Sequence, residues 1–402
     1  MKTITSNTFV MPLWGKGVLF ILSIIGIVAI FKIFLQGHII TNATQNTPWG
    51  LWVATYLYFI GLSAGAFLLS SLIYVFRIKQ FEAAGHVALV HAFICMLIAG
   101  FFILLDLGHP VRMYLLLFSF NITSVMAWMG IFYVLYLLVI VLEMYYSLNN
   151  LYLINNNGQG LPENVLAKYK NKLFWLGLIG IPIAIAVLGG EGSIFAVAKA
   201  RPNWFGGLFP IVLIISALAS GGGLLTFLSG LLLKLEQDKK ISLMQNILYV
   251  ALGFLAFDYL MLSAEMLTSF YGGTAHESAA WSQMLFGSYW FTFWILQLGI
   301  GLLFPVYVAL NKEKRSSVKW LGAAGLAIAL GIFGARMNLV MPAQYTEVLE
   351  GMSEAYHHFR FTLGYFPSAT EIMLVLGGVA LFIWLFLAAN KYLPLNTEEH
   401  KS

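Results

Sequence analysis

The chain has 402 residues, of which 60% are hydrophobic, 15% aromatic and only 10% charged, and its formal net charge is +5. Its mean hydropathy of +0.84 excludes a water-soluble domain of this length. The positive charge sits in loops between apolar runs, so it does not imply nucleic-acid binding. A single cysteine, Cys95, excludes an intrachain disulfide and leaves no cysteine cluster that could hold zinc or an iron–sulfur cluster.

Apolar runs that are long enough to cross a bilayer recur along the whole chain. A helix needs about 20 apolar residues to cross a hydrocarbon core of ~30 Å. The runs are too long and too unbroken for the strands of a barrel, so the sequence predicts an all-α, polytopic membrane protein with ten transmembrane helices. The predicted spans are 17–37, 49–76, 86–107, 122–146, 173–190, 208–233, 243–268, 288–310, 318–340 and 371–389.

Lysine and arginine are distributed unequally between the two sides of the predicted spans. Of the 22 such residues, 16 fall in the N-terminal tail, the even-numbered loops and the C-terminal tail. Because basic loops are retained in the cytoplasm, we expect both termini to be cytoplasmic. The first run, 17–37, is too long for the core of a signal peptide and has no convincing cleavage site, so it is interpreted as an uncleaved span.

A motif of small residues occurs in both the second and the sixth predicted helix. The two copies are "LSAGAFLLSSL" at 62–72 and "ASGGGLLTFLSGL" at 219–231, and the serine and glycine of the first copy are Ser63 and Gly65. Small residues let helix backbones approach one another closely in lipid, which is the interpretation that we favour. The alternative is that a ligand approaches the bare backbone there, and Ser63 and Gly65 are therefore kept as candidate ligand-binding residues.

The repeat extends beyond this motif. The two copies of the motif are offset by 157 residues, and the same offset brings Asp106 to within two positions of Glu265. The segments "NITSVMAW" and "GSYWFTFW" resemble each other more weakly. We therefore predict two related four-helix bundles, 49–190 and 208–340, that run in the same direction, with flanking helices around them. The acids of the outer segment 341–370 favour a surface helix that either docks a partner or is simply solvated.

Acidic residues inside the predicted spans are concentrated near the outer ends of the helices. Asp106, Glu191 and Glu265 lie there, and Asp258 lies two turns deeper on the same helix face as Glu265. A charged side chain in hydrocarbon costs several kcal/mol, so such residues mark functional sites and suggest proton exchange.

Asp106 begins the stretch "DLGHPVRMY", which also contains His109 and Arg112. Pro110 predicts that the chain turns there at the membrane surface. A structural ion pair between Asp106 and Arg112 is the alternative to a functional role.

Histidines are placed unfavourably for haem. Ligation of a b-type haem needs two histidines that face each other at one depth, but only His91 lies clearly inside a span. The adjacent histidines of "YHHFR" at 356–360 are typical of an interfacial loop. We therefore expect that the chain binds neither haem nor a metal ion.

Three quoted segments carry a resemblance to a known family. They are "TPWGLWVATYLYFIGLSAGAFLLSS", "DLGHPVRMYLLLFSFNITSVMAW" and "ARPNWFGGLFPIVLIISALASGGGLL". Over most of its length the chain resembles the polysulfide-reductase membrane subunit family, also called NrfD-like. Its ten helices and its C-terminal end are most similar to the longer branch, which includes membrane subunits of a periplasm-facing hydrogenase, of the sulfite-reduction-linked complex and of the alternative complex that replaces cytochrome bc-type enzymes.

This resemblance implies a function. It implies a subunit of the bacterial inner membrane that carries no haem or iron–sulfur cluster of its own. Such a subunit binds a quinone, menaquinone or ubiquinone, near the periplasmic face. It exchanges electrons with a ferredoxin-like iron–sulfur subunit, next to a further catalytic or cytochrome subunit. The candidate acid–base residues are Asp106, His109 and Glu191, and the candidate quinone-binding residues are Trp49, Ser63, Gly65, Arg112, Asn121 and Ser124.

A comparable loop of some relatives carries a histidine where this chain has Glu191. The first bundle, 49–190, is the expected location of the quinone. Asp258, Glu265 and His91 are candidate stations of a proton path, for which hydrogen-bonded packing is the alternative.

Two other classes of protein remain open from the residues alone. One is a secondary transporter, against which stand the parallel repeat, the outward bias of the acids and the lack of an obvious broken helix near mid-membrane. The other is a passive anchor that only docks a catalytic complex. The sequence does not say which electron donor or acceptor is used, in which direction the quinone reacts, or whether protons are pumped.

Overall fold

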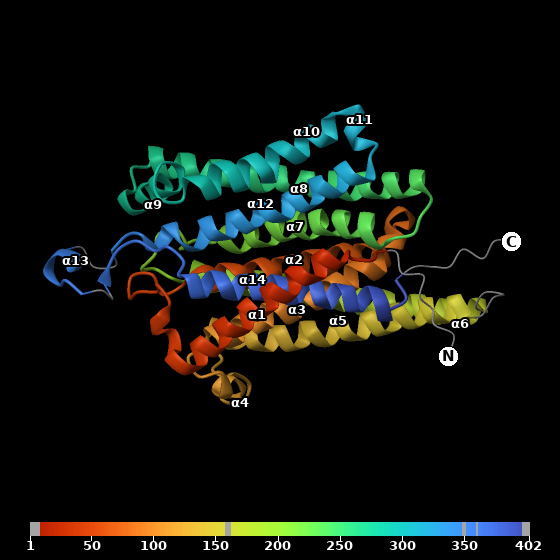
Figure 1. Ribbon diagram of the computed structural model, residues 1–402, viewed down its shortest axis with the longest axis horizontal. Helices are drawn as coiled ribbons and strands as arrows, with labels where there is room; N and C mark the ends of the chain where they lie inside the picture. The colour runs from red at the N-terminus through yellow and green to blue at the C-terminus, as the bar shows by residue number, and fades with distance from the viewer. Residues whose placement is uncertain (1–8, 157–161, 348–350, 359–360, 396–402) are drawn as a thin grey trace.

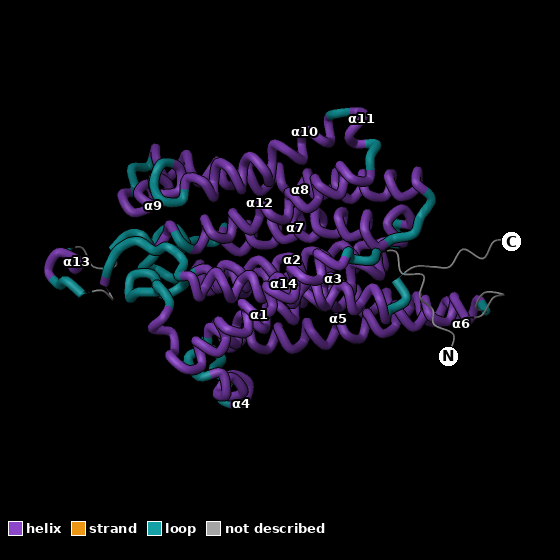
Figure 2. The backbone as a smooth tube through the Cα atoms, in the orientation of Figure 1, coloured by secondary structure: helices purple, strands orange, loops and turns teal. Residues whose placement is uncertain are grey.

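The fold is seen in a computed structural model that describes residues 9–156, 162–347, 351–358 and 361–395. Within these residues the regular structure is entirely helical, and ten helices are long and apolar enough to cross a membrane, which confirms the predicted class and number of spans (Figures 1 and 2). These helices are α1 (Leu13–Gln36), α2 (Leu51–Phe76), α3 (Glu82–Asp106), α5 (Val125–Asn156), α6 (Glu163–Ala196), α7 (Phe209–Leu232), α8 (Gln237–Tyr271), η4 with α10 (Thr292–Leu303 and Phe304–Leu310), α12 (Val318–Val340) and α14 (Ala369–Tyr392).

Short helices lie in the connections. They are η1 (Gly37–Ile40), η2 (Lys79–Phe81), η3 (Pro110–Tyr114), α4 (Leu115–Phe118), α9 (Ala275–Leu285), α11 (Lys312–Arg315), η5 (Pro342–Gln344) and α13 (Met352–Ala355). The predicted turn at Pro110 is confirmed, because α3 ends at Asp106 and the chain continues in η3 and α4.

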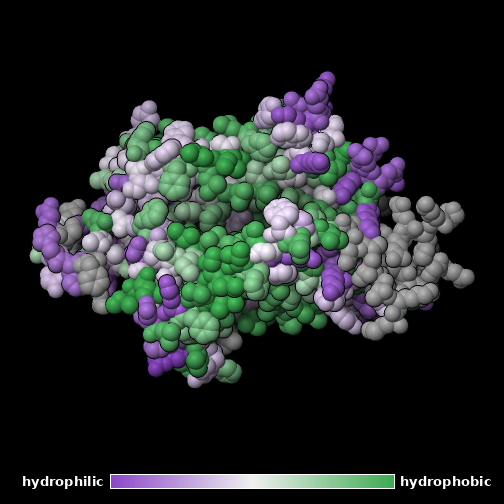
Figure 3. Space-filling view, in the orientation of Figure 1, coloured by the Kyte–Doolittle hydropathy of each residue, from purple (hydrophilic) through white to green (hydrophobic). Residues whose placement is uncertain are grey.

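The long helices lie side by side, and their two ends differ in charge. One end, where α11 and the start of α6 lie, carries the lysine-rich connections and is called the lysine-rich end below; α4, α9 and α13 lie at the other, lysine-poor end (Figure 1). A broad apolar band covers the middle of the molecule between more hydrophilic ends (Figure 3). Large apolar side chains such as Phe20 and Phe31 are exposed in this band and therefore face lipid.

The helices form two groups of four that meet at α2 and α7. The first group is α2, α3, α5 and α6, and the second is α7, α8, α10 with η4, and α12. At the crossing of α2 and α7, a Cβ atom on Gly65 would overlap the carbonyl oxygen of Ala217, so only glycine fits there. Ser63 donates a hydrogen bond from Oγ to the carbonyl oxygen of Ala92 at 2.6 Å. Both residues thus take part in the packing of the helices, and their role as ligand-binding residues stays a prediction.

The first and last spans flank the first group. Helices α1 and α14 lie against each other and touch at Gly26 and Gly377, and α14 also packs on α3, where Gly378 meets the ring of Phe102. Because ten spans is an even number, α1 begins and α14 ends at the same, lysine-rich end of the molecule.

The eighth span is one continuous helix from Thr292 to Leu310, but it is not a regular α-helix throughout. Residues Thr292–Leu303 form π-helical turns, and regular α-helix resumes at Phe304. Pro305 supplies a physical reason, because proline has no N–H to donate to the carbonyl four residues earlier, that of Gly301. At the same place Gly301 packs closely against Gly331 of α12.

The outer segment 341–370 also differs from the surface helix that we expected. Its start, Pro342–Gln344, is a buried turn of η5 and not a surface element. The described residues further on contain only one short helix, Met352–Ala355. Glu350, one of the acids behind the expectation, lies outside the described residues.

Candidate functional site

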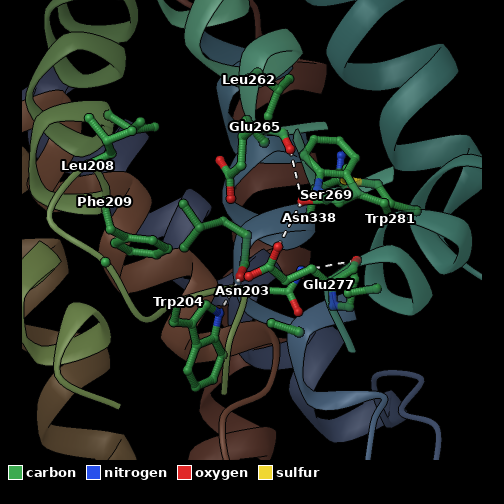
Figure 4. Close-up of a pocket in the computed structure, with 18 of the residues that line it drawn as sticks. Asn203, Trp204, Leu208, Phe209, Leu262, Glu265, Ser269, Glu277, Trp281 and Asn338 are labelled. Carbon is green, nitrogen blue, oxygen red and sulfur yellow. Dashed lines mark hydrogen bonds between the residues drawn. The ribbon is translucent and has the colours of Figure 1, made fainter. Parts of the chain in front are cut away.

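A cavity of about 350 Å³ lies in the second group of helices, near the lysine-poor end. Its walls come from α7, α8, α9 and α12 and from the connection that precedes α7. Trp204 and Phe209 lie on one side of it and Trp281 on the other (Figure 4). The polar side chains that line it include Ser216, Asp258, Glu265, Glu277, Gln297, Arg336 and Asn338. The cavity therefore combines aromatic walls with a few polar groups, as small-molecule sites commonly do.

Arg336, on α12, is the central cation of this site. Its side chain is only 2% exposed, and Nη2 donates a hydrogen bond to Ser216 Oγ at 2.8 Å. Its charge interacts with Asp258 of α8 and with Glu191 of α6, which are 4% and 1% exposed. Its Nε has no hydrogen-bond partner among the described residues. A buried guanidinium is tolerated when acids compensate its charge, and the free Nε leaves one donor available to a ligand.

Glu191 connects this cation to the first group of helices. It accepts a hydrogen bond from the hydroxyl of Tyr133 on α5. Tyr56 of α2 interacts electrostatically with both Glu191 and Asp106. A row of ionisable side chains therefore runs across the boundary between the two groups, from Asp258 through Arg336 and Glu191 to Asp106.

Two further acids, Glu265 and Glu277, line the cavity (Figure 4). Their like charges interact with each other. Glu277 Oε2 accepts hydrogen bonds from Thr274 Oγ1 at 2.8 Å and from Ser269 Oγ at 3.2 Å. Glu265 receives no such bond to its carboxylate in the described structure, so it is the freer of the two acids to exchange a proton with a ligand.

Amide side chains form the floor between the π-helical segment and α12. Asn338 Nδ2 donates to Gln297 Oε1 at 2.6 Å, and Asn338 Oδ1 accepts from the hydroxyl of Thr292. The hydroxyl of Tyr259 donates to the main-chain carbonyl of Gln297 at 2.6 Å. Since the Asn338 amide has a partner on both its nitrogen and its oxygen, its orientation is fixed before any ligand binds.

Aromatic rings connect the cavity wall to the start of α2. Trp204 stacks on Trp49 with ring centroids 5.2 Å apart, and Phe195 meets both rings edge-on at about 5 Å. Trp204 Nε1 donates to the carbonyl oxygen of Leu339 at 2.8 Å, which fixes the ring against α12. Trp49, predicted to bind the quinone, thus contacts a residue of the cavity wall but does not line the cavity itself.

The lysine-poor end is closed by buried polar contacts. Arg201 donates to the main-chain carbonyls of Thr346 and Asn46, and burial lowers the pKa of its guanidinium. The hydroxyl of Tyr365 donates to Glu371 and accepts the N–H of Leu51 at 2.8 Å. Burial, and then the neighbouring Glu371, raise the pKa of Tyr365, so its phenol stays a hydrogen-bond donor at neutral pH.

The other predicted site residues are placed apart from the cavity. Asp106 is half-buried at the end of α3, His109 and Arg112 are exposed, and no ion pair joins Asp106 to Arg112 in the described structure. Asn121 is exposed and accepts bonds from Thr123. Their roles stay predictions.

Two more of the predicted residues also lie away from it. Ser124, half-buried, accepts the N–H of Ala127 at 3.3 Å. His91 is fully buried in α3, and neither of its ring nitrogens has a partner among the described residues. Their roles, too, remain untested.

Sequence reasoning missed several residues that line the cavity. Arg336 lies inside the predicted span 318–340, where a cation is a signal in itself, and it was nevertheless not singled out. Glu277, Gln297 and Asn338 gave no signal, because their relation to Asp258 depends on how the helices pack. In the described residues, no group of three or more His, Cys, Asp or Glu side chains is arranged to hold a metal ion.

The fold and the site define a class: a multi-pass α-helical membrane protein with ionisable side chains buried between its helices. A family model described as "Polysulphide reductase, NrfD" matches residues 39–348. The chain therefore belongs to the NrfD polysulphide reductase family, which confirms the resemblance found in its sequence.

Three relatives are similar to the chain over nearly its whole length. A selenate reductase subunit of Mesobacillus selenatarsenatis is 34% identical over 94% of this chain and 93% of its own. The Hdr-like menaquinol oxidoreductase integral membrane subunit of Archaeoglobus fulgidus is 26% identical over 89% and 88%. A putative dimethyl sulfoxide reductase membrane subunit of Halobacterium salinarum is 27% identical over 94% and 90%. The chain is thus a membrane subunit of a multisubunit redox complex with catalytic partner subunits.

Proposed function

We propose that this subunit passes electrons between a membrane quinone and its partner subunits, and that the quinone ring reacts in the cavity at the lysine-poor end. The observation that carries the proposal is Arg336, a buried cation that lines the cavity, keeps Nε unpartnered among the described residues and interacts electrostatically with two buried acids. The similarity to a subunit named for menaquinol oxidation supports the choice of a quinone, with menaquinone the first candidate and ubiquinone the other.

The chemistry of a quinone fits the residues of this site. Reduction of a quinone consumes two electrons and two protons, and oxidation of a quinol returns them, so a quinone site needs groups that exchange protons next to the ring oxygens. In the cavity, Arg336 donates a hydrogen bond to one ring oxygen, and Asp258 or Glu265 exchanges protons with the quinone. Trp204 and Trp281 supply flat apolar walls for the ring.

The volume of the cavity fits part of such a molecule. At about 350 Å³ it lies at the lower end of the ~300–1,000 Å³ that small-molecule pockets occupy. It holds the ring, and the isoprenoid tail extends into the lipid that surrounds the apolar faces of the helices.

We propose that the lysine-poor end faces the periplasm, because basic loops are retained in the cytoplasm. The iron–sulfur subunit then docks at this end, close to the cavity, and both termini are cytoplasmic. The cluster of that partner supplies or accepts the electrons, and the residues of this chain bind the quinone, orient it and exchange its protons.

The first group of helices offers the other location for the quinone, next to Asp106, His109, Arg112, Asn121 and Ser124. We retain it as the competing proposal, since Asp106 stands at the far end of the row that Tyr56 and Glu191 connect to Arg336. In this arrangement the cavity is not the place of reaction, and Asp106 is the acid that meets the quinone.

Substitution of each acid separates the two locations. In the purified complex, we expect Asp258→Asn to lower quinone turnover about a hundredfold, because a positioned proton donor contributes roughly 10²–10⁴ in rate. Asp238→Asn is the matched control, since Asp238 is an exposed acid at the other end of the same helix. Subunit assembly is checked by gel filtration of the complex. An Asp258→Asn complex with unchanged turnover, and an Asp106→Asn complex without turnover, would overturn the location in the cavity.

A further inference from the structure

Glu143, on α5, is a buried acid that the proposed quinone site does not use. Its side chain is 0% exposed, and neither carboxylate oxygen has a hydrogen-bond partner among the described residues. Burial of an acid without a partner costs several kcal/mol, so proteins retain such a residue mainly where it works. Glu143 lies in the first group of helices, between the lysine-rich end and the row that contains Glu191.

The face of α5 that carries Glu143 holds three further polar side chains. Tyr133, Tyr136, Glu143 and Ser147 are separated by three, seven and four residues, which places all four on one side of a helix. Tyr136 and Ser147 are also 0% exposed, so this side faces the interior of the helix group. An apolar side would have packed there at lower cost.

Toward the lysine-poor end, this face reaches the site described above. Tyr133 donates its hydroxyl hydrogen to Glu191. Tyr136 shares a hydrogen bond of 3.1 Å with Ser63 and interacts electrostatically with Glu143. Glu143 is therefore coupled to the hydroxyls that precede Glu191.

Toward the lysine-rich end, the same face continues through Ser147. Its hydroxyl lies 2.6 Å from His86 Nδ1 and 2.9 Å from the hydroxyl of Tyr74. Tyr74 interacts electrostatically with Glu143 and with Glu82, which lies at the start of α3. Polar groups thus extend from Glu143 toward the surface at the lysine-rich end.

Two buried serines of α2 supply further polar groups in the same half of the helix group. The hydroxyls of Ser70 and Ser71 are fully buried and have no partner in the described structure, one turn before Tyr74. Buried polar atoms are nearly always satisfied by protein or by internal water, so this half of the helix group is suited to hold water molecules beside Glu143.

The second group of helices has no counterpart of this acid. When the chain is aligned so that Trp128 matches Trp294, Ala309 stands in the place of Glu143 and Leu302 in the place of Tyr136. The polar face is therefore a property of the first group alone and not a by-product of the repeat.

We propose that this face of α5 conducts protons between the lysine-rich end and the quinone site, with Glu143 as the carboxyl that accepts and releases them. The inference rests on the proposed reaction with a quinone. During quinone reduction, each proton enters near Glu82 and His86, passes Glu143 and Tyr136, and arrives at Glu191. Arg336 couples Glu191 to Asp258, and Asp258 or Glu265 delivers the proton to the quinone in the cavity. Two electrons from the partner and two such protons yield one quinol. Oxidation of a quinol sends the protons in the opposite direction. The path predicted through Asp258, Glu265 and His91 stays a separate prediction.

The test uses the complete complex in proteoliposomes with a pH-sensitive dye on the side of the lysine-rich end. Glu143→Gln keeps the shape of the side chain and removes its proton exchange. We expect proton uptake or release on that side to fall more than about tenfold, as for loss of a positioned proton carrier. Quinone turnover of the variant falls in parallel, because the protons that complete the quinol take this route. Glu236→Gln is the matched control, since Glu236 is an exposed acid at the same end.

A second readout depends on Glu143 itself. The infrared difference spectrum between the quinone-oxidised and quinone-reduced complex is expected to contain a carboxyl C=O band that Glu143→Gln removes and Glu236→Gln keeps. Proton movement at the lysine-rich end that is equal in wild type and Glu143→Gln overturns the route, and so does a wild-type complex that turns over quinone without such movement. A wild-type complex without quinone turnover instead overturns the proposed function on which the route rests.

Discussion

Gln344 forms two hydrogen bonds with the main chain of Trp49, although 295 positions separate the two residues. Its Nε2 donates to the carbonyl oxygen of Trp49 at 2.7 Å, and its Oε1 accepts the N–H of Trp49 at 3.1 Å. The buried side chain of Gln344 thus holds the start of α2 against the end of α12. Because Trp49 stacks on Trp204, this contact also supports the aromatic wall of the cavity.

Removal of this contact should weaken the lysine-poor end of the protein. Gln344→Ala leaves the N–H and the carbonyl of Trp49 buried without a partner, which costs about 1–3 kcal/mol for each unsatisfied group. We expect a lower midpoint of thermal unfolding in detergent and a weaker affinity for quinone. Gln245→Ala is a control, since Gln245 donates to Arg315 in a connection at the lysine-rich end. Equal quinone affinity in the two variants would show that Gln344 does not support the site.

The crossing of α2 and α7 should tolerate no side chain. Gly65→Ala places a methyl group on the carbonyl oxygen of Ala217, and an overlap of this kind in a packed interior costs typically about 1–3 kcal/mol. Gly100→Ala, on the neighbouring α3, has no atom within 4 Å of the added carbon. We predict that only Gly65→Ala lowers the thermal midpoint of the detergent-solubilised protein, and similar midpoints for both variants would contradict the tight crossing.

The charge of Arg336 should matter more than its shape. Arg336→Gln leaves Asp258 and Glu191 buried without a compensating cation, and we expect quinone turnover to fall by about 10²–10³, as when an oriented electrostatic contact is lost. Arg336→Lys keeps the positive charge and should recover part of this loss, although it cannot reproduce the geometry of the guanidinium. The measurement is the steady-state quinone turnover of the assembled complexes. Equal losses of turnover in Arg336→Gln and Arg336→Lys would indicate that Arg336 has a purely structural role.

The raised pKa of Tyr365 predicts that the folded protein loses stability at alkaline pH. Because its pKa is raised in the folded protein, the folded state holds its phenolic proton more tightly than the unfolded state, whose tyrosine pKa is about 10. The stabilisation is therefore complete below about pH 10 and is lost as the pH rises further. In Tyr365→Phe this contribution is absent, so thermal midpoints measured across the alkaline range should fall less steeply than in the wild type. Thermal midpoints that fall equally steeply with pH in the wild type and in Tyr365→Phe would contradict this role of Tyr365.

Hydropathy was sufficient to predict the ten helices, because each span must satisfy its own backbone in lipid. It did not predict where the helices end in water. Helix α6 starts at Glu163, ten residues before the predicted span, because the polar residues there continue the helix beyond the apolar stretch. The π-helical turns of the eighth span depend on Pro305 together with the contact of Gly301 and Gly331, and such a contact is not visible in one sequence.

Residues of the site could be predicted from the sequence only where they lie on a single helix. Asp258 and Glu265 could be assigned to one face because seven residues separate them, and both line the cavity. The contacts of Arg336 reach α6 and α8, so they arise from packing between helices and not from spacing along one. Glu143 stands inside the predicted span 122–146, where an acid is a signal by itself, and was nevertheless missed.

The location of the quinone is tested most directly by photoaffinity labelling. The complete complex is illuminated with an azido-substituted quinone, and the labelled peptides are identified by mass spectrometry, with and without excess unmodified quinone. We predict label that competes with quinone in residues 202–216 or 258–285, which border the cavity. Competed label confined to residues 106–128 would place the quinone in the first group of helices and contradict the account.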